Sequence, residues 1–211
     1  MANIIFYSQN PSVYLWTATM VAAEKGVDWS LKEIETGSEL HRRLHPFAKS
    51  PVLQHGAVFV YETSAVAHYI DGAFDGPALQ PDDPLGQADV LRWISLVNAY
   101  FFPAMTNGLA KQRLLVPMQD GVPDEELIAT SAQQMRDQLV VITRALRLHD
   151  FLGGNRLTIA DCFLFPHLHL ASFTEEGRAV LKDHKLAEQW LTRMRARPSF
   201  AATDQFAVQA A

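Results

Sequence analysis

The feature that most constrains the fold is a change of pattern about 75 residues into the chain. Up to that point, short apolar runs alternate with stretches of helical periodicity. The segment 71–84 (DGAFDGPALQPDDP) then concentrates Gly, Pro and Asp, and strand-like alternation does not return after it. The pattern predicts two domains, over residues 1–76 and 86–211, joined by a linker at 77–85.

The N-terminal part predicts the order strand, helix, strand, helix, strand, strand, helix. Gly26 suits the C-terminal cap of the first helix, and His55-Gly56 suits a tight hairpin between the last two strands. This order combines a parallel unit with a hairpin, so it predicts an α/β domain with a mixed sheet flanked by helices. The expected strands cover residues 3–7, 29–34, 51–54 and 58–61, and the helices cover 12–25, 39–44 and 63–72.

The C-terminal part shows only helical patterns, which predicts an all-α domain. A long helical pattern over residues 86–116 contains Pro103, where we expect a kink. A second covers residues 123–148 and opens with a proline and three acidic residues, which suit a helix N-terminus. Further helices are predicted from Thr158 and over 185–196.

Composition excludes several classes of partner. Among 211 residues, 48% are hydrophobic and the formal net charge is −5, so no basic field is present to attract nucleic acid or an anionic membrane. No apolar run reaches the roughly 18 to 20 residues that a spanning helix needs. The single cysteine, Cys162, excludes an internal disulfide, and the N-terminus MANIIFYSQN does not resemble a signal peptide. We expect a soluble, cytoplasmic protein.

Four local signatures occur in the order and spacing of one family. The linker is one of them, and the other three are Pro46-Phe47-Ala48-Lys49-Ser50-Pro51-Val52-Leu53, Glu62-Thr63-Ser64-Ala65-Val66 and Leu157-Thr158-Ile159-Ala160-Asp161 with the residues up to Pro166. Together they resemble the glutathione transferase superfamily over nearly the whole chain. The resemblance implies a thioredoxin-like N-terminal domain, an all-helical C-terminal domain and glutathione as cosubstrate.

The resemblance also implies which residues bind glutathione. Pro51 is expected to be cis, so that the main chain of Ser50 can pair with the cysteinyl part of the tripeptide; the alternative is a trans proline beginning an edge strand. Glu62 is expected to pair with the γ-glutamyl ammonium, and Thr63 with the adjacent carboxylate, although Thr63 could also only cap its helix. Lys49 is expected to reach the glycyl carboxylate, or to be a solvated surface lysine.

The chemistry of such a site requires the glutathione thiol to ionise, because the thiolate is the nucleophile. A hydroxyl near the start of the first helix can donate to the thiolate, and the helix dipole adds positive potential there. The candidates are Tyr7, Ser8, Ser12 and Tyr14. Ser12 is preferred because residues 12–26 resemble the serine-using branches of the family; the alternative is a plain N-terminal cap.

The remaining assignments concern the electrophile pocket, the oligomeric state, a helix cap and a possible metal site. Tyr14, Tyr100 and Met105 are assigned to a pocket for a hydrophobic electrophile, and the family implies a homodimer. Thr158 and Asp161 have the spacing of a capping box and are assigned a structural role. No metal site is expected, because His167 and His169 lie two apart on a predicted helix and point to different faces.

The resemblance therefore implies a detoxifying enzyme that conjugates glutathione to small hydrophobic electrophiles or uses it to reduce peroxides. The alternative is a non-catalytic, transferase-like module that binds a protein. The first helix leaves room for this alternative, because Thr17 and Thr19 replace the basic residues usual there. Ala48 also stands where a glycine is expected, and His45 where an asparagine is expected, so the class within the family stays open.

Overall fold

The computed structural model describes residues 4–205, and the chain divides into two compact units. The first unit comprises Met1–Gln80 together with Arg197–Ala211, and the second comprises Pro81–Ala196. Within the described part of the chain, no helix is long and apolar enough to cross a membrane.

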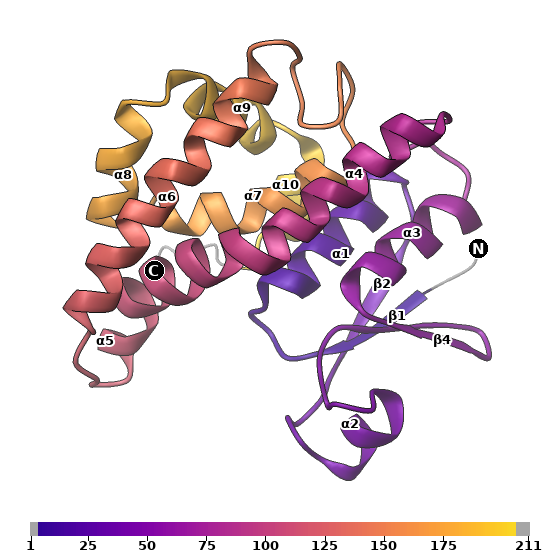
Figure 1. Ribbon diagram of the computed structural model, residues 1–211. Helices are drawn as coiled ribbons and strands as arrows, with labels where there is room; N and C mark the ends of the chain where they lie inside the picture. The colour runs from indigo at the N-terminus through magenta and orange to yellow at the C-terminus, as the bar shows by residue number, and fades with distance from the viewer. Residues whose placement is uncertain (1–3, 206–211) are drawn as a thin grey trace. The chain divides into compact units, whose positions relative to one another are not determined.

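The first unit is built on a mixed four-stranded sheet (Figure 1). Its strands run in the order β2-β1-β3-β4; β1 and β2 are parallel, and the other two pairs are antiparallel. This confirms the predicted thioredoxin-like α/β fold class of the N-terminal domain. The strands are β1 (Ile4–Ser8), β2 (Trp29–Glu33), β3 (Val52–His55) and β4 (Val58–Tyr61).

Three helices accompany the sheet: α1 (Val13–Glu24), α2 (Glu39–Leu44) and α3 (Thr63–Ala73). Helices α1 and α3 pack against one another. Cross-strand partners point to the same face of a sheet, so Phe6 and its partner Leu53 lie on one face, and both are fully buried. Trp16 of α1 is fully buried as well. All three side chains belong to the buried core of the first unit.

A short helix from the end of the chain, α10 (Pro198–Thr203), also belongs to the first unit. The sequence-based boundary assigns residues 197–211 to the helical domain instead. The reason for the difference lies in α1: the Trp16 indole N–H donates to Thr203 Oγ1 at 3.1 Å, and Arg197 forms two hydrogen bonds of 2.6 Å with the Glu24 carboxylate. Residues 206–211 lie outside the described part of the chain.

The second unit is helical, as predicted. Every residue of α7 is buried, which is the expected state of a helix that is apolar on all sides. Helix α7 packs against α4, the segment η1 and α9, while α6 packs against η1, α8 and α9. The elements are α4 (Pro84–Leu96), η1 (Val97–Leu115), α5 (Val116–Met118), α6 (Glu125–Leu146), α7 (Ile159–Ala171), α8 (Glu175–Lys182) and α9 (Lys185–Arg195).

The segment η1 differs from its prediction. A kink was expected at Pro103, but the whole of Val97–Leu115 is wound as a π-helix. Proline has no N–H to donate, and in an α-helix its ring meets the carbonyl one turn earlier. A π-helix has more residues per turn than an α-helix, so a different carbonyl lies beside the proline ring. The helix therefore continues through Pro103 with π-helical hydrogen bonding.

Candidate functional site

The register of the sheet brings the predicted binding residues of the first unit together. Tyr7 at the end of β1 pairs with Val52 at the start of β3, and Val52 pairs with Tyr61 at the end of β4. The β1–α1 loop, the chain before β3 and the junction between β4 and α3 therefore meet at one edge of the sheet. These three segments carry Ser12, Lys49 to Pro51, and Glu62 with Thr63.

The chain before β3 has the expected conformation at Pro51. The Ser50–Pro51 peptide bond is cis. Among the described residues, no main-chain hydrogen bond uses the N–H or the C=O of Ser50, so both groups are open to another extended chain. Lys49 is exposed, and its carbonyl accepts a hydrogen bond from His41 at 3.0 Å.

Two residues around this edge have backbone conformations that are costly for a side chain. Ala48 has φ 46° and Glu62 has φ 67°. The left-handed region costs roughly 1–2 kcal/mol for a residue with a Cβ atom. The positive φ of Ala48 explains why the family pattern has a glycine at this position, since glycine adopts positive φ without strain. Strained backbone conformations of this kind cluster at functional sites.

Glu62 also stands at the N-terminus of α3. It occupies the N-cap position, but no side chain caps the helix through a hydrogen bond. The first N–H groups of α3, beginning with the buried Thr63, are therefore not satisfied by a cap. Such groups, together with the helix dipole, favour a bound carboxylate.

Ser12 lies at the N-terminus of α1 and is half-buried. Its hydroxyl oxygen accepts from the Leu15 N–H at 3.4 Å, so it caps the helix. A hydroxyl can accept and donate at once, and no described residue accepts the Ser12 hydroxyl hydrogen. The main-chain N–H of Ser12 donates to Gln205 Oε1 at 3.2 Å.

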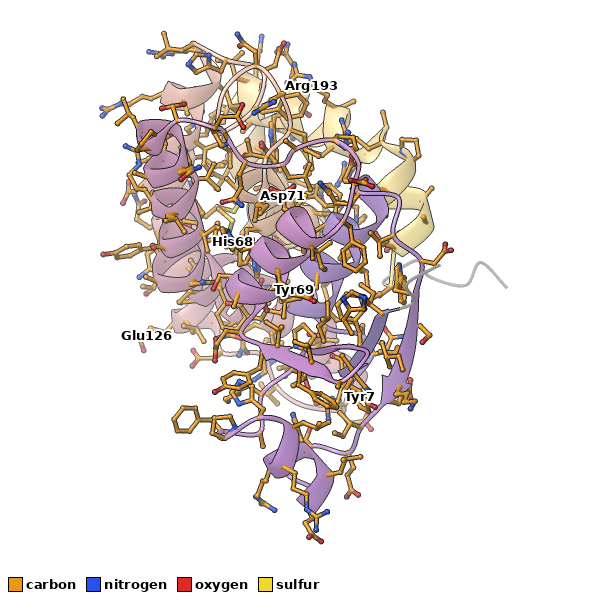
Figure 2. All side chains as sticks on the ribbon, turned by 90° about the vertical axis from the view of Figure 1, so that its right-hand side faces the viewer. Tyr7, His68, Tyr69, Asp71, Glu126 and Arg193 are labelled. Atoms are coloured by element: carbon orange, nitrogen blue, oxygen red, sulfur yellow. The ribbon has the colours of Figure 1, made fainter. Side chains whose placement is uncertain are left out.

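The neighbouring hydroxyl groups of Ser8 and Tyr7 already donate their hydrogens to other residues. The buried Ser8 hydroxyl donates to the Gln9 carbonyl at 2.9 Å, and the Tyr7 hydroxyl donates to Gln54 Oε1 at 2.7 Å. Figure 2 marks Tyr7 at the sheet, on the side of α2. Of these three hydroxyl groups, only Ser12 retains an uncommitted hydrogen within the described part of the chain.

Tyr14 interacts electrostatically with the Glu62 carboxylate. Burial of the phenol, and then the Glu62 carboxylate, raise the pKa of Tyr14 to about 12. Its hydroxyl therefore stays protonated at neutral pH and acts as a neutral polar group. Tyr14 belongs to the same edge of the first unit as the predicted glutathione residues.

The other two residues assigned to the electrophile pocket lie in the second unit. Tyr100 is 60% exposed, whereas Met105 is fully buried in the helical core. Of these two residues, only Tyr100 is exposed and could contact an electrophile. It lines a mainly apolar hollow of about 360 Å³ between η1 and α6, together with Leu96, Ala99, Phe101, Pro103, Gln134, Asp137, Gln138 and Val141.

Sequence reasoning missed two buried histidines that contact the predicted binding residues. His41 of α2 hydrogen-bonds to the Lys49 carbonyl, and His45, which follows α2, hydrogen-bonds to the Glu62 carboxylate at 3.2 Å. The departure from asparagine at His45 was the available signal. Its partner is 17 positions away in the sequence, so the contact depends on the fold.

Comparison with known proteins gives matches to both parts of the chain. Residues 11–73 match a family model described as the N-terminal domain of glutathione S-transferase. Residues 125–193 match a model described as the C-terminal domain of the same family. The two matches fall in the first and the second unit respectively.

Related proteins and structures agree with this assignment. Glutathione S-transferase F14 of Arabidopsis thaliana is 26% identical over 181 residues, 84% of this chain and 70% of the relative. The probable glutathione S-transferase GSTF2 of Oryza sativa subsp. japonica is 25% identical over 205 residues, covering 94% of each. The structure of glutathione S-transferase III in apo form superposes with a TM-score of 0.87 at 25% identity, covering 96% of both chains. With both domain models matched in order, the chain belongs to the glutathione S-transferase superfamily.

Proposed function

We propose that this protein is a glutathione transferase that binds glutathione at the sheet edge of its first unit. The observation that carries the proposal is the strand register, which gathers Ser12, the open main chain of Ser50 and the Glu62–Thr63 junction. A related fold supports it: glutathione S-transferase-I bound with lactoylglutathione superposes with a TM-score of 0.86 at 22% identity, covering 95% of this chain and 97% of the other.

In this proposal each part of the tripeptide has its own partner. The cysteinyl part adds an extended segment to the main chain of Ser50, next to Pro51. The γ-glutamyl ammonium pairs with Glu62, and its carboxylate meets Thr63 and the uncapped N–H groups of α3. Lys49 binds the glycyl carboxylate.

The reaction proposed is attack by the glutathione thiolate on a small hydrophobic electrophile. The Ser12 hydroxyl donates to the thiolate and stabilises it, so the thiol loses its proton more easily. A carbon–sulfur bond forms as the leaving group departs with its electron pair. Tyr14 supplies aromatic surface for the electrophile, and the same thiolate can reduce a peroxide. Such reactions would serve detoxification in the reducing cytoplasm.

Binding and turnover assays test this proposal and its alternative. We expect retention on immobilised glutathione, and catalysed conjugation of an aryl halide or reduction of a hydroperoxide. Retention without turnover of either substrate would favour a non-catalytic binding module. Failure to bind glutathione would contradict the proposal altogether.

We also propose a homodimer, because the first unit exposes several large apolar side chains. Phe47 is 77% exposed, and Val58, Phe59 and Tyr61 of β4 are each more than 40% exposed. Apolar surface of this kind marks a site of association, and a two-fold dimer would bury it in both subunits.

Replacing Phe47 with serine is expected to weaken this dimer at least tenfold, because burial of one aromatic side chain contributes about 1.5–3 kcal/mol. Sedimentation equilibrium of the wild type and of Phe47→Ser would measure the change. Leu148→Ser, on the second unit, is a matched control because Leu148 is 76% exposed. Equal weakening by both substitutions would contradict the assignment to Phe47.

A further inference from the structure

The chain that follows His45 holds its ring in one orientation and, in the neutral form, in one tautomer. It directly follows α2, and its side chain is 1% exposed. The Phe47 main-chain N–H donates to His45 Nδ1 at 3.0 Å. A nitrogen that accepts a hydrogen bond carries no proton, so in the neutral ring the proton is on Nε2.

The protonated nitrogen of this ring is directed at Glu62. His45 Nε2 lies 3.2 Å from Glu62 Oε1, so the N–H donates to that carboxylate oxygen. The Glu62 side chain is 63% exposed and has few other restraints, since it does not cap α3. Within the described part of the chain no hydrogen bond is recorded for Glu62 Oε2, which leaves that oxygen open to a ligand.

His41, one helical turn earlier, is held in the same way, but its Nε2 is directed at Lys49 and Ser50 instead of Glu62. The Gly37 N–H donates to His41 Nδ1 at 3.2 Å, which places the proton on Nε2. That nitrogen lies 3.0 Å from the Lys49 carbonyl oxygen and 3.2 Å from Ser50 Oγ. His41 therefore contacts the chain before Pro51, whereas His45 contacts Glu62.

We propose that His45 is a positioning residue that selects ligands with a free amino group, by fixing the Glu62 carboxylate with Oε2 turned to the ammonium of the γ-glutamyl part. This inference rests on the proposed function and adds to it a residue that determines specificity. A carboxylate already fixed by a buried donor loses less conformational freedom when it pairs with the ammonium. His41, by contrast, supports the main chain that meets the cysteinyl part, so it does not distinguish ligands by their amino group.

The test compares glutathione with its des-amino analogue, in which hydrogen replaces the γ-glutamyl amino group. Calorimetry gives the affinity ratio of the two ligands for each variant. We expect a ratio of about tenfold for the wild type, since a hydrogen bond to a charged group contributes roughly the free energy of one decade. His45→Asn keeps an acceptor near Nδ1 but loses the Nε2–H, so its ratio should fall to about threefold.

Four further variants distinguish a positioning role of His45 from a general loss of structure. His45→Gln restores a donor near the position of Nε2 and should recover most of the ratio. His41→Asn, a matched change at a histidine with 2% exposure, should weaken both ligands alike and keep the ratio. Glu62→Gln should abolish the preference, and adding His45→Asn to it should change the ratio no further.

An unchanged ratio in a folded His45→Asn variant, or an equal fall in His41→Asn, would overturn the role of His45 and leave the proposed function intact. A wild type that binds neither ligand would overturn both. The tautomer of the His45 imidazole can also be measured in the wild type, without any variant. Long-range ¹H–¹⁵N spectra of the wild type should show His45 with its proton on Nε2, and the opposite tautomer would refute the inference.

Discussion

Asp161→Ala is expected to lower the free energy of unfolding by about 3 kcal/mol or more, with a fall of roughly 10 °C in melting temperature. Asp161 is fully buried at the start of α7. Its carboxylate accepts from the Leu152 and Thr158 main-chain N–H groups at 2.9 and 3.0 Å, from the Thr158 hydroxyl at 3.0 Å and from the Trp190 indole at 2.9 Å. Alanine would leave three N–H groups buried without an acceptor, and each costs roughly 1–3 kcal/mol.

The position of Asp161 also explains why the loss should affect stability and not binding. Thr158 and Asp161 form the predicted capping box of α7, and the carboxylate additionally ties α7 to α9 through Trp190. Thermal unfolding measures the loss, and calorimetry should give an unchanged glutathione affinity per folded molecule. A variant that melts normally but no longer binds glutathione would contradict this structural role.

Asp83 is a suitable control for this prediction. It caps α4 by accepting from the Gly86 N–H at 2.9 Å, but the site is exposed. Water can replace the lost carboxylate there, so Asp83→Ala should cost only about 1 kcal/mol. A similar cost for both substitutions would mean that burial adds nothing at Asp161.

The capping box shows which parts of this protein can be predicted from sequence. Thr158 and Asp161 are three residues apart, so their interaction is local and the pattern is sufficient to identify it. The strands and helices of the first unit are also local patterns, and their observed bounds lie within about two residues of the predicted ones. The cis bond at Pro51 was expected only from the family resemblance.

Features that depend on distant contacts were not predictable in this way. The α10 helix joins the first unit because Thr203 meets Trp16, a pairing that spans 187 positions. The contact of His45 with Glu62 depends on the C-terminal end of α2 facing the β4–α3 junction. The winding of η1 is another such feature, because Pro103 suggested a kink, whereas the whole of Val97–Leu115 is π-helical and packs against α6 and α7.

For the proposed thiol-activating group, the sequence left several candidates, and the hydrogen bonds of the described residues favour Ser12. Ser8 and Tyr7 donate their hydroxyl hydrogens to protein carbonyl oxygens, while the Ser12 hydroxyl hydrogen has no acceptor among the described residues. Ser12→Ala is therefore expected to slow conjugation about 100-fold, the usual effect of removing one donor to a developing or stabilised anion. Glutathione affinity should change little, since the hydroxyl acts on the sulfur and not on the ends of the tripeptide.

Two measurements separate this chemical role from the cap that Ser12 provides to α1. Thiolate absorbance of bound glutathione, followed against pH, should show a higher thiol pKa in Ser12→Ala than in the wild type, because the donor to the thiolate is missing. Ser12→Thr keeps both the cap and the donor, so it should retain most of the activity. If Ser12→Ala turned over at the wild-type rate with an unchanged thiol pKa, the activating donor would be Ser8, Tyr7 or a main-chain N–H at the start of α1.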